Sequence, residues 1–225
     1  MKIKFAWPNT REWEDAVRLA KEKYVQSFNA KTSPNPTCFV VGILPDESGT
    51  ETVAACAGLT FADSRQLFSE QYLPLPIEQH IQQAENQSVE RNAIVEVGSL
   101  ASVYPQAGSE LARLMPLICW CIGMRYFICT STVQLRKLLT KLNIAFKPLL
   151  VVEQQNLSEN MVERWGSYYE QQPETGYVCI AQHATNFGSH TGLFMFENLV
   201  IKAKLPPKQN PVTAKKDKED DYAMA

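Results

Sequence analysis

Apolar and polar residues alternate along the chain in blocks whose spacing predicts both helices and strands. In the first block, apolar residues recur at three- and four-residue spacing from Trp13 to Phe28, which is typical of an amphipathic helix. Asn9 and Glu12 stand in capping-box spacing at its start. We therefore expect a first helix that begins after Asn9 and ends near Asn29.

Two strand-like runs follow, over residues 38–44 and 52–60. The segment between them, PDESGTE, is rich in turn-forming residues, so the two runs are expected to form an antiparallel hairpin. The chain then changes direction at FSEQYLPLP, and the apolar spacing after Pro76 predicts a short helix.

The run from Ile94 to Met124 is the most informative part of the chain. It predicts a β-branched strand buried on both faces, a short loop that carries Pro105 and Gly108, and a long apolar helix. A strand (YFICTS), a helix over about residues 132–143 and a last strand (FKPLLVV) follow. Beyond that strand the pattern is mixed and predicts no regular element.

This order of elements is that of an α/β fold with a GNAT-like (N-acyltransferase-like) mixed sheet flanked by helices. In such a fold the central strand splays from its neighbour. The exposed strand amides then hold the pantetheine arm of an acyl carrier, and the following loop and helix N-terminus hold its pyrophosphate. Residues 1–204 are expected to form a single domain of this kind. Residues 205–225, rich in Pro, Lys and acidic residues, are expected to form a disordered polar tail.

Composition and short motifs exclude several classes of protein. The formal net charge of −2 argues against nucleic acid as the main partner. The six cysteines show no C-x-x-C spacing, so we expect buried free thiols, a reducing compartment and no metal site. No G-x-S-x-G motif supports a lipase mechanism. No signal peptide and no membrane-spanning window are recognised, so we expect a cytoplasmic protein, with secretion by a non-signal route left open.

Glu96 is the one ionisable residue in the buried strand, where a carboxylate is costly to bury. Two interpretations are open. The carboxylate forms an ion pair with Arg91, Arg113 or Arg125, or it accepts a proton from an amine because burial raises its pKa. We favour the second interpretation, which makes Glu96 the main candidate catalytic residue.

Tyr72 and Glu70 are the other candidate catalytic residues. Tyr72 is either an aromatic residue packed under a turn, or a phenol beside a carboxylate that gives a proton to a leaving thiolate. Both interpretations stay open.

Three motifs resemble the thermostable hemolysin family of the delta type: FSEQYL (68–73), IVEVGSLAS (94–102) and WGSYY (165–169). The resemblance covers roughly residues 38–169. It implies hemolytic activity on expression, and a likeness to acyl-homoserine-lactone synthases and other N-acyltransferase-like proteins. The chain departs from the Glu-x-x-Arg pattern of those synthases, because Glu96 is followed by Val, Gly and Ser. It meets the acetyltransferase phosphate loop only loosely, over residues 103–109.

These departures leave the identity of the ligand open among acyl-CoA, an acyl carrier protein thioester and S-adenosylmethionine. The strand and helix start that would hold the cofactor comprise Val97, Gly98, Ser99, Leu100, Ala107, Gly108 and Ser109. An apolar wall for the acyl substrate would come from Trp165, Tyr168 and Tyr169, with Gly166 indicating a close backbone approach.

Two hypotheses of function follow. In the first, the protein is an acyltransferase that moves an acyl group from a CoA or carrier-protein thioester to an amine, and hemolysis results from the product. In the second, the protein is a directly membrane-active cytolysin. Its candidate membrane segments are the helix LARLMPLICWCIGM, which is apolar nearly all round like a core helix, and GLFMFENLVIKAK, which suits a membrane surface. The partner is then a small molecule in the first case and a membrane surface in the second.

Overall fold

The computed structural model describes residues 1–46, 48–154, 157, 159–184 and 187. Residues Met1–His190 belong to one compact unit. The predicted domain end at residue 204, the polar tail at 205–225 and the candidate membrane segment at 192–204 lie outside the described residues.

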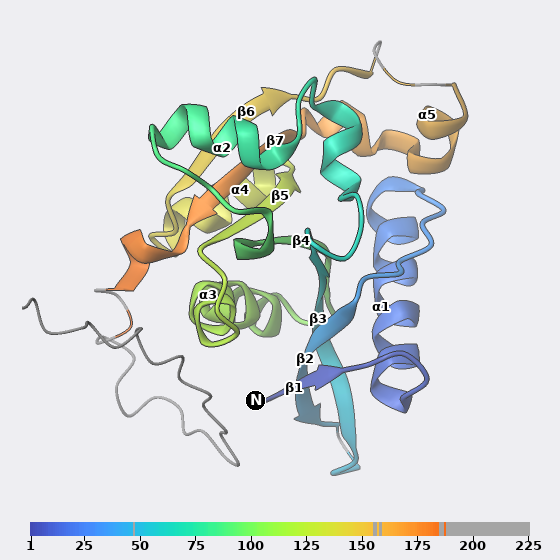
Figure 1. Ribbon diagram of the computed structural model, residues 1–225. Coiled ribbons are helices and arrows are strands. Elements are labelled where there is room, and N and C mark those ends of the chain that lie inside the picture. Colours follow the sequence, from blue (N-terminus) through green and yellow to red (C-terminus); the bar gives the residue numbers. More distant parts are fainter. Residues whose placement is uncertain (47, 155–156, 158, 185–186, 188–225) are drawn as a thin grey trace, which may run out of the picture. The chain divides into compact units, whose positions relative to one another are not determined.

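Within the described residues, seven strands form one mixed sheet in the order β1-β2-β3-β4-β5-β7-β6 (Figure 1). All neighbouring strands pair antiparallel except β4 and β5, which are parallel. The strands are β1 (Lys2–Ala6), β2 (Cys38–Pro45), β3 (Glu51–Phe61), β4 (Ile94–Ser102), β5 (Tyr126–Ser131), β6 (Phe146–Val151) and β7 (Glu174–Cys179). The α-helices are α1 (Arg11–Phe28), α2 (Ile77–Glu85), α3 (Pro105–Cys121), α4 (Val133–Lys141) and α5 (Glu159–Trp165). The 3-10 helices η1 (Phe68–Tyr72) and η4 (Gly166–Gln171) border the site described below.

Helices cover both faces of the sheet. Helix α1 packs on one face through Ala16 and Ala20, and α3 packs on the opposite face through residues such as Leu111 (Figure 1). Successive residues of β4 alternate between these faces, because side chains of a strand point alternately to either side. Val95 belongs to the α3 cluster and Ile94 to the cluster of α2. Glu96 therefore shares its face with α1 and α2.

The parallel pair β4 and β5 is short. Their paired positions run only from Ile94 opposite Tyr126 to Glu96 opposite Ile128, although β4 continues to Ser102. Beyond Glu96, the edge of β4 that faces β5 makes no ladder hydrogen bond to it within the described residues. The splay expected for this fold is present.

The predicted α/β class, with its mixed sheet flanked by helices, is confirmed. The hairpin of β2 and β3, the strand with Glu96, and the strands YFICTS and FKPLLVV all form as the pattern predicts. The pattern gave no indication of β1 or β7. Strand β1 is a short edge strand, and β7 has a glycine and no polar–apolar alternation to mark it.

Two predicted helix starts are wrong in detail. Thr10, not Asn9, caps α1: its hydroxyl accepts from the Trp13 amide, while Asn9 takes a left-handed conformation at φ 68°. Helix α3 starts at Pro105, because proline is well suited to a first helical position where no amide hydrogen bond is lost. Gly108 therefore lies within the helix, and the loop is only residues 103–104.

Helix α3 is a core helix, as its apolar sequence indicates. Its buried residues include Leu111, Ala112, Met115 and Cys119. Of the six cysteines, Cys121 at its end is exposed, contrary to the expectation that all are buried. No helix in the described part of the chain is long and apolar enough to cross a membrane.

Candidate active site

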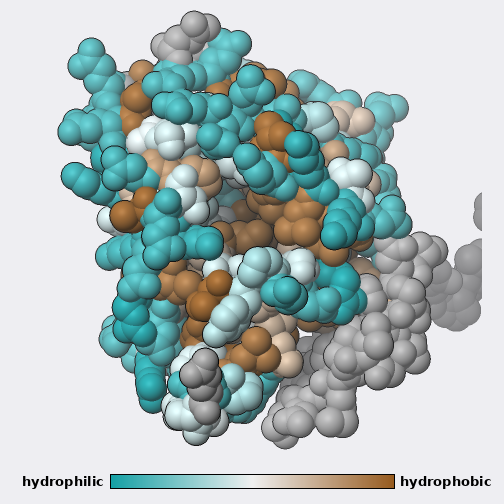
Figure 2. Space-filling view, turned by 180° about the vertical axis from the view of Figure 1, so that it is seen from behind, coloured by the Kyte–Doolittle hydropathy of each residue, from teal (hydrophilic) through white to brown (hydrophobic). Residues whose placement is uncertain are grey.

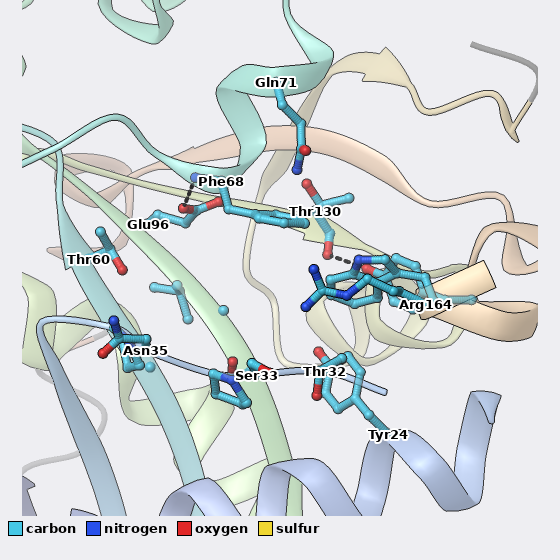
Figure 3. Close-up of a pocket in the computed structure, with 18 of the residues that line it drawn as sticks. Tyr24, Thr32, Ser33, Asn35, Thr60, Phe68, Gln71, Glu96, Thr130 and Arg164 are labelled. Atoms are coloured by element: carbon cyan, nitrogen blue, oxygen red, sulfur yellow. Dashed lines mark hydrogen bonds between the residues drawn. The ribbon is translucent and has the colours of Figure 1, made fainter. Parts of the chain in front are cut away.

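Glu96 is buried at 7% exposure and is held by main-chain amides, not by an arginine. One carboxylate oxygen, Oε2, accepts from the Phe68 amide at 2.7 Å (Figure 3). The other, Oε1, accepts from the Ser69 amide at 2.8 Å and from the Ser69 hydroxyl. The predicted ion-pair alternative is therefore wrong, because none of the three arginines considered contacts this carboxylate.

Burial raises the pKa of the Glu96 carboxyl above its ordinary range. The hydrogen bonds from Ser69 and from the amide of Phe68 oppose this effect, because they stabilise the ionised form. The nearby charge of Glu70 adds to the increase. Because Oε2 has one protein donor against two at Oε1, it keeps room for a further hydrogen bond. A carboxylate with a raised pKa and a free acceptor position is a candidate general base.

Glu96 lies in the wall of a pocket of about 470 Å³. One wall is the segment between α1 and β2, from Lys31 to Pro36, and the opposite wall is η1 with its flanking residues (Figure 3). Between them lie β4, at Glu96 to Ser99, and Thr130 of β5. The pocket therefore sits where the two parallel strands begin to separate.

Aromatic side chains from three distant segments close the pocket at one end. These residues are Tyr24, Phe68, Tyr72, Trp165 and Tyr168. Their rings pack edge to face, tilted or stacked, with Phe68 to Trp165 at 5.4 Å and Trp165 to Tyr168 at 5.0 Å between centroids. Such pairs stabilise an aromatic cluster beyond the area that they bury.

Gly166 explains how this wall is held against α1. A Cβ at this position would lie 2.2 Å from the carbonyl oxygen of Phe28, and the residue has φ 51°, which favours glycine. The Lys31 amide donates to the Arg164 carbonyl at 2.7 Å, and the Ser167 hydroxyl donates to the Phe28 carbonyl. The predicted close backbone approach at Gly166 is confirmed, and it joins the two sides of the pocket.

A β-bulge shapes β4 where it lines the pocket. Ser99 takes φ 50°, and the pairing with β3 shifts between Cys56, opposite Ala101, and Gly58, opposite Gly98. A Cβ added at Gly98 would meet nothing within 4 Å, so this glycine leaves open space next to Glu96. The bulge and this glycine open the floor of the pocket.

The structure brings together about half of the predicted site residues. Glu96, Val97, Gly98, Ser99, Tyr72, Trp165 and Tyr168 line the pocket, and Leu100, Tyr169, Glu70, Ala107, Gly108 and Ser109 do not. Tyr169 lies behind the wall, with its phenol oxygen 2.8 Å from that of Tyr72. Leu100 packs against the core on the α3 side.

Glu70 is engaged outside the pocket. Its carboxylate receives two hydrogen bonds from the Arg91 guanidinium, at 2.6 and 2.8 Å, and the amides of Leu67 and Ile77. Burial acts to raise its pKa, but Arg91 and the amides outweigh it and lower the pKa below the ordinary value. This carboxylate anchors η1 and does not line the pocket.

The start of α3 lies at the far end of β4 and contributes no residue to the pocket. The Gly108 amide already donates to the Tyr104 carbonyl, so the amides left over by the first turn belong to Gln106 and Ala107. Gly108 itself is required by packing, because a Cβ there would lie 2.5 Å from the Ser102 hydroxyl.

Sequence reasoning missed Ser69, Thr130, Lys31 and Arg164. The Ser69 hydroxyl donates to Glu96, and its oxygen lies 3.2 Å from the hydroxyl oxygen of Thr130. The Thr130 oxygen in turn lies 2.8 Å from the hydroxyl oxygen of Thr175. Ser69 lies inside the FSEQYL motif, which could have indicated it. Neither Lys31 nor Arg164 belongs to a motif, and only the fold brings them to the pocket. In the described part of the chain no cluster of His, Cys, Asp or Glu could hold a metal ion.

Three solved structures are similar to this protein over most of their length. BjaI, a CoA-dependent acyl-homoserine lactone synthase solved with SAM and isopentyl-CoA, has TM-score 0.52 and 16% identity, over 84% of this chain and 89% of BjaI. FeeM, an N-acyl amino acid synthase from uncultured soil microbes, has TM-score 0.51 and 10% identity, over 82% and 98%. TofI in an apo form has TM-score 0.50 and 12% identity, over 80% and 91%.

These similarities, together with the splayed strands, define the chain as a GNAT-like α/β protein of the fold shared by these synthases. A family model for thermostable hemolysin matches residues 7–184. The protein belongs to the thermostable hemolysin family, and the resemblance expected from its three motifs is confirmed. No curated protein matches the chain at a significant level.

Proposed function

We propose that the protein is an N-acyltransferase, which moves an acyl group from a CoA or carrier-protein thioester to an amine. The observation that carries this proposal is the position of Glu96, at the last paired residue before β4 and β5 separate and in the wall of the pocket. The donor and the acceptor would meet at this point from two sides.

The donor would lie along the free edge of β4. From Val97 to Ser102 the strand has no partner on the β5 side among the described residues, so its amide and carbonyl groups can bind the amides of a pantetheine arm. The unpaired amides of Gln106 and Ala107, at the start of the seventeen-residue helix α3, would bind the donor's phosphates. Of the predicted cofactor residues, Val97 to Leu100 and Ala107 keep this role. BjaI, with SAM and isopentyl-CoA, supports a thioester donor.

The amine would enter through the pocket and attack the thioester carbonyl carbon. The new C–N bond forms as Glu96 Oε2 accepts the amine proton, and the strand amides stabilise the oxyanion. The C–S bond then breaks, the leaving thiolate accepts a hydrogen bond from the Tyr72 phenol, and the proton taken from the amine passes from Glu96 to the thiolate. The aromatic wall with Trp165 and Tyr168 excludes water from this step.

The product is an acylated amine, a surface-active molecule that would account for hemolysis without a pore. Under this proposal the family name describes the effect of the product on red cells. The core position of α3 supports it, because the most apolar helix of the described chain is buried against the sheet.

The test combines ligand binding with one substitution. A donor present at a hundred times its Kd should add about 2.7 kcal/mol to the free energy of unfolding, measured as a thermal shift against CoA, acyl-CoAs and S-adenosylmethionine. Thiol release in the presence of amines should then fall about 10²- to 10⁴-fold in Glu96→Gln, since the proton acceptor is lost. Glu14→Gln, at an exposed acid on α1, is the matched control.

Two results would contradict the proposal. One is lysis of red cells by purified protein without any acyl donor. The other is full hemolysis by cells that express the folded Glu96→Gln variant.

A further inference from the structure

The pocket is unusually rich in positive charge for a site whose one acid is Glu96. Lys31, Arg65 and Arg164 all line it. Arg65 is occupied, because its guanidinium donates to the Asn35 carbonyl and lies 3.5 Å from the Thr60 hydroxyl. Lys31 and Arg164 have no side-chain hydrogen bond or ion pair within the described residues.

Lys31 and Arg164 lie next to each other in the pocket wall. The Lys31 amide donates to the Arg164 carbonyl, so the two residues are neighbours across the junction of α1 and α5. Figure 3 shows the Arg164 side chain extending into the pocket on the side away from Glu96. The pocket is therefore polar at both ends, with a carboxylate at one and cations at the other.

A third polar group lies at the cationic end. The Thr32 hydroxyl is buried and has no hydrogen-bond partner among the residues that the structure describes, although Thr32 lines the pocket next to Lys31. A buried hydroxyl without a partner is costly, and a ligand that accepts its hydrogen bond removes that cost. This observation indicates a polar ligand atom at the cationic end, independently of the charges.

We propose that the acceptor is an α-amino acid or a molecule with that head group. Its amine would face Glu96 and its carboxylate would bind Arg164, Lys31 and the Thr32 hydroxyl. Guanidinium groups bind carboxylates strongly in this way, because two N–H groups match two oxygens. This inference rests on the proposed function and names its substrate class. S-adenosylmethionine also carries an α-amino acid head group and fits the same description.

The donor's phosphates are the other candidate anion for these cations. The start of α3, where those phosphates are proposed to bind, contributes no residue to this pocket, and α3 packs on the other face of the sheet. The cations and that helix therefore serve different ligands.

The experiment compares acceptors that differ only in the carboxylate. Thiol release from an acyl-CoA, and from the matching acyl carrier protein thioester, is measured with L-phenylalanine against phenethylamine, and with L-leucine against isoamylamine. The amino acids should have kcat/KM values higher by about tenfold to a hundredfold, because a charge-assisted hydrogen bond is lost with each amine. Equal use of the amines would overturn the inference.

Substitution of Arg164 locates the carboxylate. Arg164→Ala should raise KM for the amino acid about tenfold or more, with KM for the acyl-CoA and for phenethylamine unchanged. Arg164→Lys should recover part of the loss, and Thr32→Val should show a smaller loss of the same kind. Arg113→Ala, at an arginine on α3 that pairs with Glu110, is the matched control.

The two proposals fail in different ways. If Arg164→Ala raises KM for the acyl-CoA and not for the acceptor, the cations bind the donor's phosphates and the inference is wrong while the acyltransferase stands. If no amine of either kind releases thiol from either thioester, the proposed function itself is wrong.

Discussion

Two buried carboxylates, those of Glu70 and Glu96, contact η1, and they differ in the groups that stabilise them. Three successive amides at its start, those of Leu67, Phe68 and Ser69, donate to them: the first to Glu70 and the next two to Glu96. Glu70 also has the Arg91 guanidinium, whereas Glu96 has only neutral donors. The pKa of Glu70 is lowered and that of Glu96 is raised.

The difference separates a structural carboxylate from one that can take part in a reaction. A fixed cation keeps Glu70 ionised and fills its acceptor positions, so it has nothing left to offer a substrate. Neutral donors hold Glu96 in place without fixing its protonation state, and its remaining acceptor position lies in the pocket wall. Both carboxylates position η1, and only one is available for chemistry.

The largest expected effect is on the free energy of unfolding, and it tests whether Glu70 has the structural role and Glu96 does not. Glu70→Gln should lower the free energy of unfolding at pH 7 by about 3 kcal/mol, because Arg91 loses its buried partner, although it keeps Glu78 at 2.7 Å. Glu96→Gln should lose less, about 1–2 kcal/mol, because the new amide nitrogen cannot accept from the Phe68 or Ser69 amide and leaves one buried N–H without a partner. Urea denaturation measures both. Equal losses in the two variants would remove the distinction.

The contributions of Glu70 and Glu96 to stability depend on pH in opposite directions. Because the pKa of Glu70 is lowered, its contribution to stability is present above its unfolded value and is lost as pH falls through its folded value. Because the pKa of Glu96 is raised, its contribution is present at low pH and is lost as pH rises through its folded value. The deficit of Glu70→Gln should therefore shrink in acid, which urea titrations below pH 4 would show.

A smaller effect is expected at the other end of η1, where Tyr72 faces the pocket. Tyr72→Phe should lower kcat about 10- to 100-fold, because the hydrogen bond from the phenol to the leaving thiolate is lost. Tyr169→Phe breaks the same 2.8 Å contact but removes no group from the pocket, so its kcat should change less than about threefold. If both variants lose activity equally, the phenol pair only supports the wall.

Local patterns predicted much of the fold, because the central strands are apolar and the turns are rich in breakers. The strand with Glu96 and the hairpin before it needed no distant information. Strand β7 pairs with two strands and is nearly all buried, yet its sequence, ETGYVC, has no periodicity. Its identity as a strand depends on neighbours that sequence spacing does not show.

The site was predictable where one segment carried it and not where several segments meet. Glu96 could be predicted because a lone carboxylate in an apolar strand is costly to bury, which indicates a partner or a function. Its true partners, the amides of Phe68 and Ser69, lie more than twenty residues away and are main-chain groups, so no residue type marks them. Glu70 was also a candidate in the sequence, and only the position of Arg91 shows that it is occupied.

The smallest expected effect concerns the Ser69 hydroxyl, which lowers the pKa of Glu96 against the effect of burial. Ser69→Ala removes that hydrogen bond and should raise the pKa further. Since the ionised carboxylate accepts the amine proton, activity rises with pH through this pKa. The acid limb of kcat/KM should therefore move to higher pH in Ser69→Ala, with the rate on the alkaline side nearly unchanged. Ser109→Ala, whose hydroxyl contacts the Gln106 carbonyl on α3, should leave the profile in place. A Ser69→Ala profile that moves to lower pH, or does not move, would mean that the limb reports a group other than Glu96.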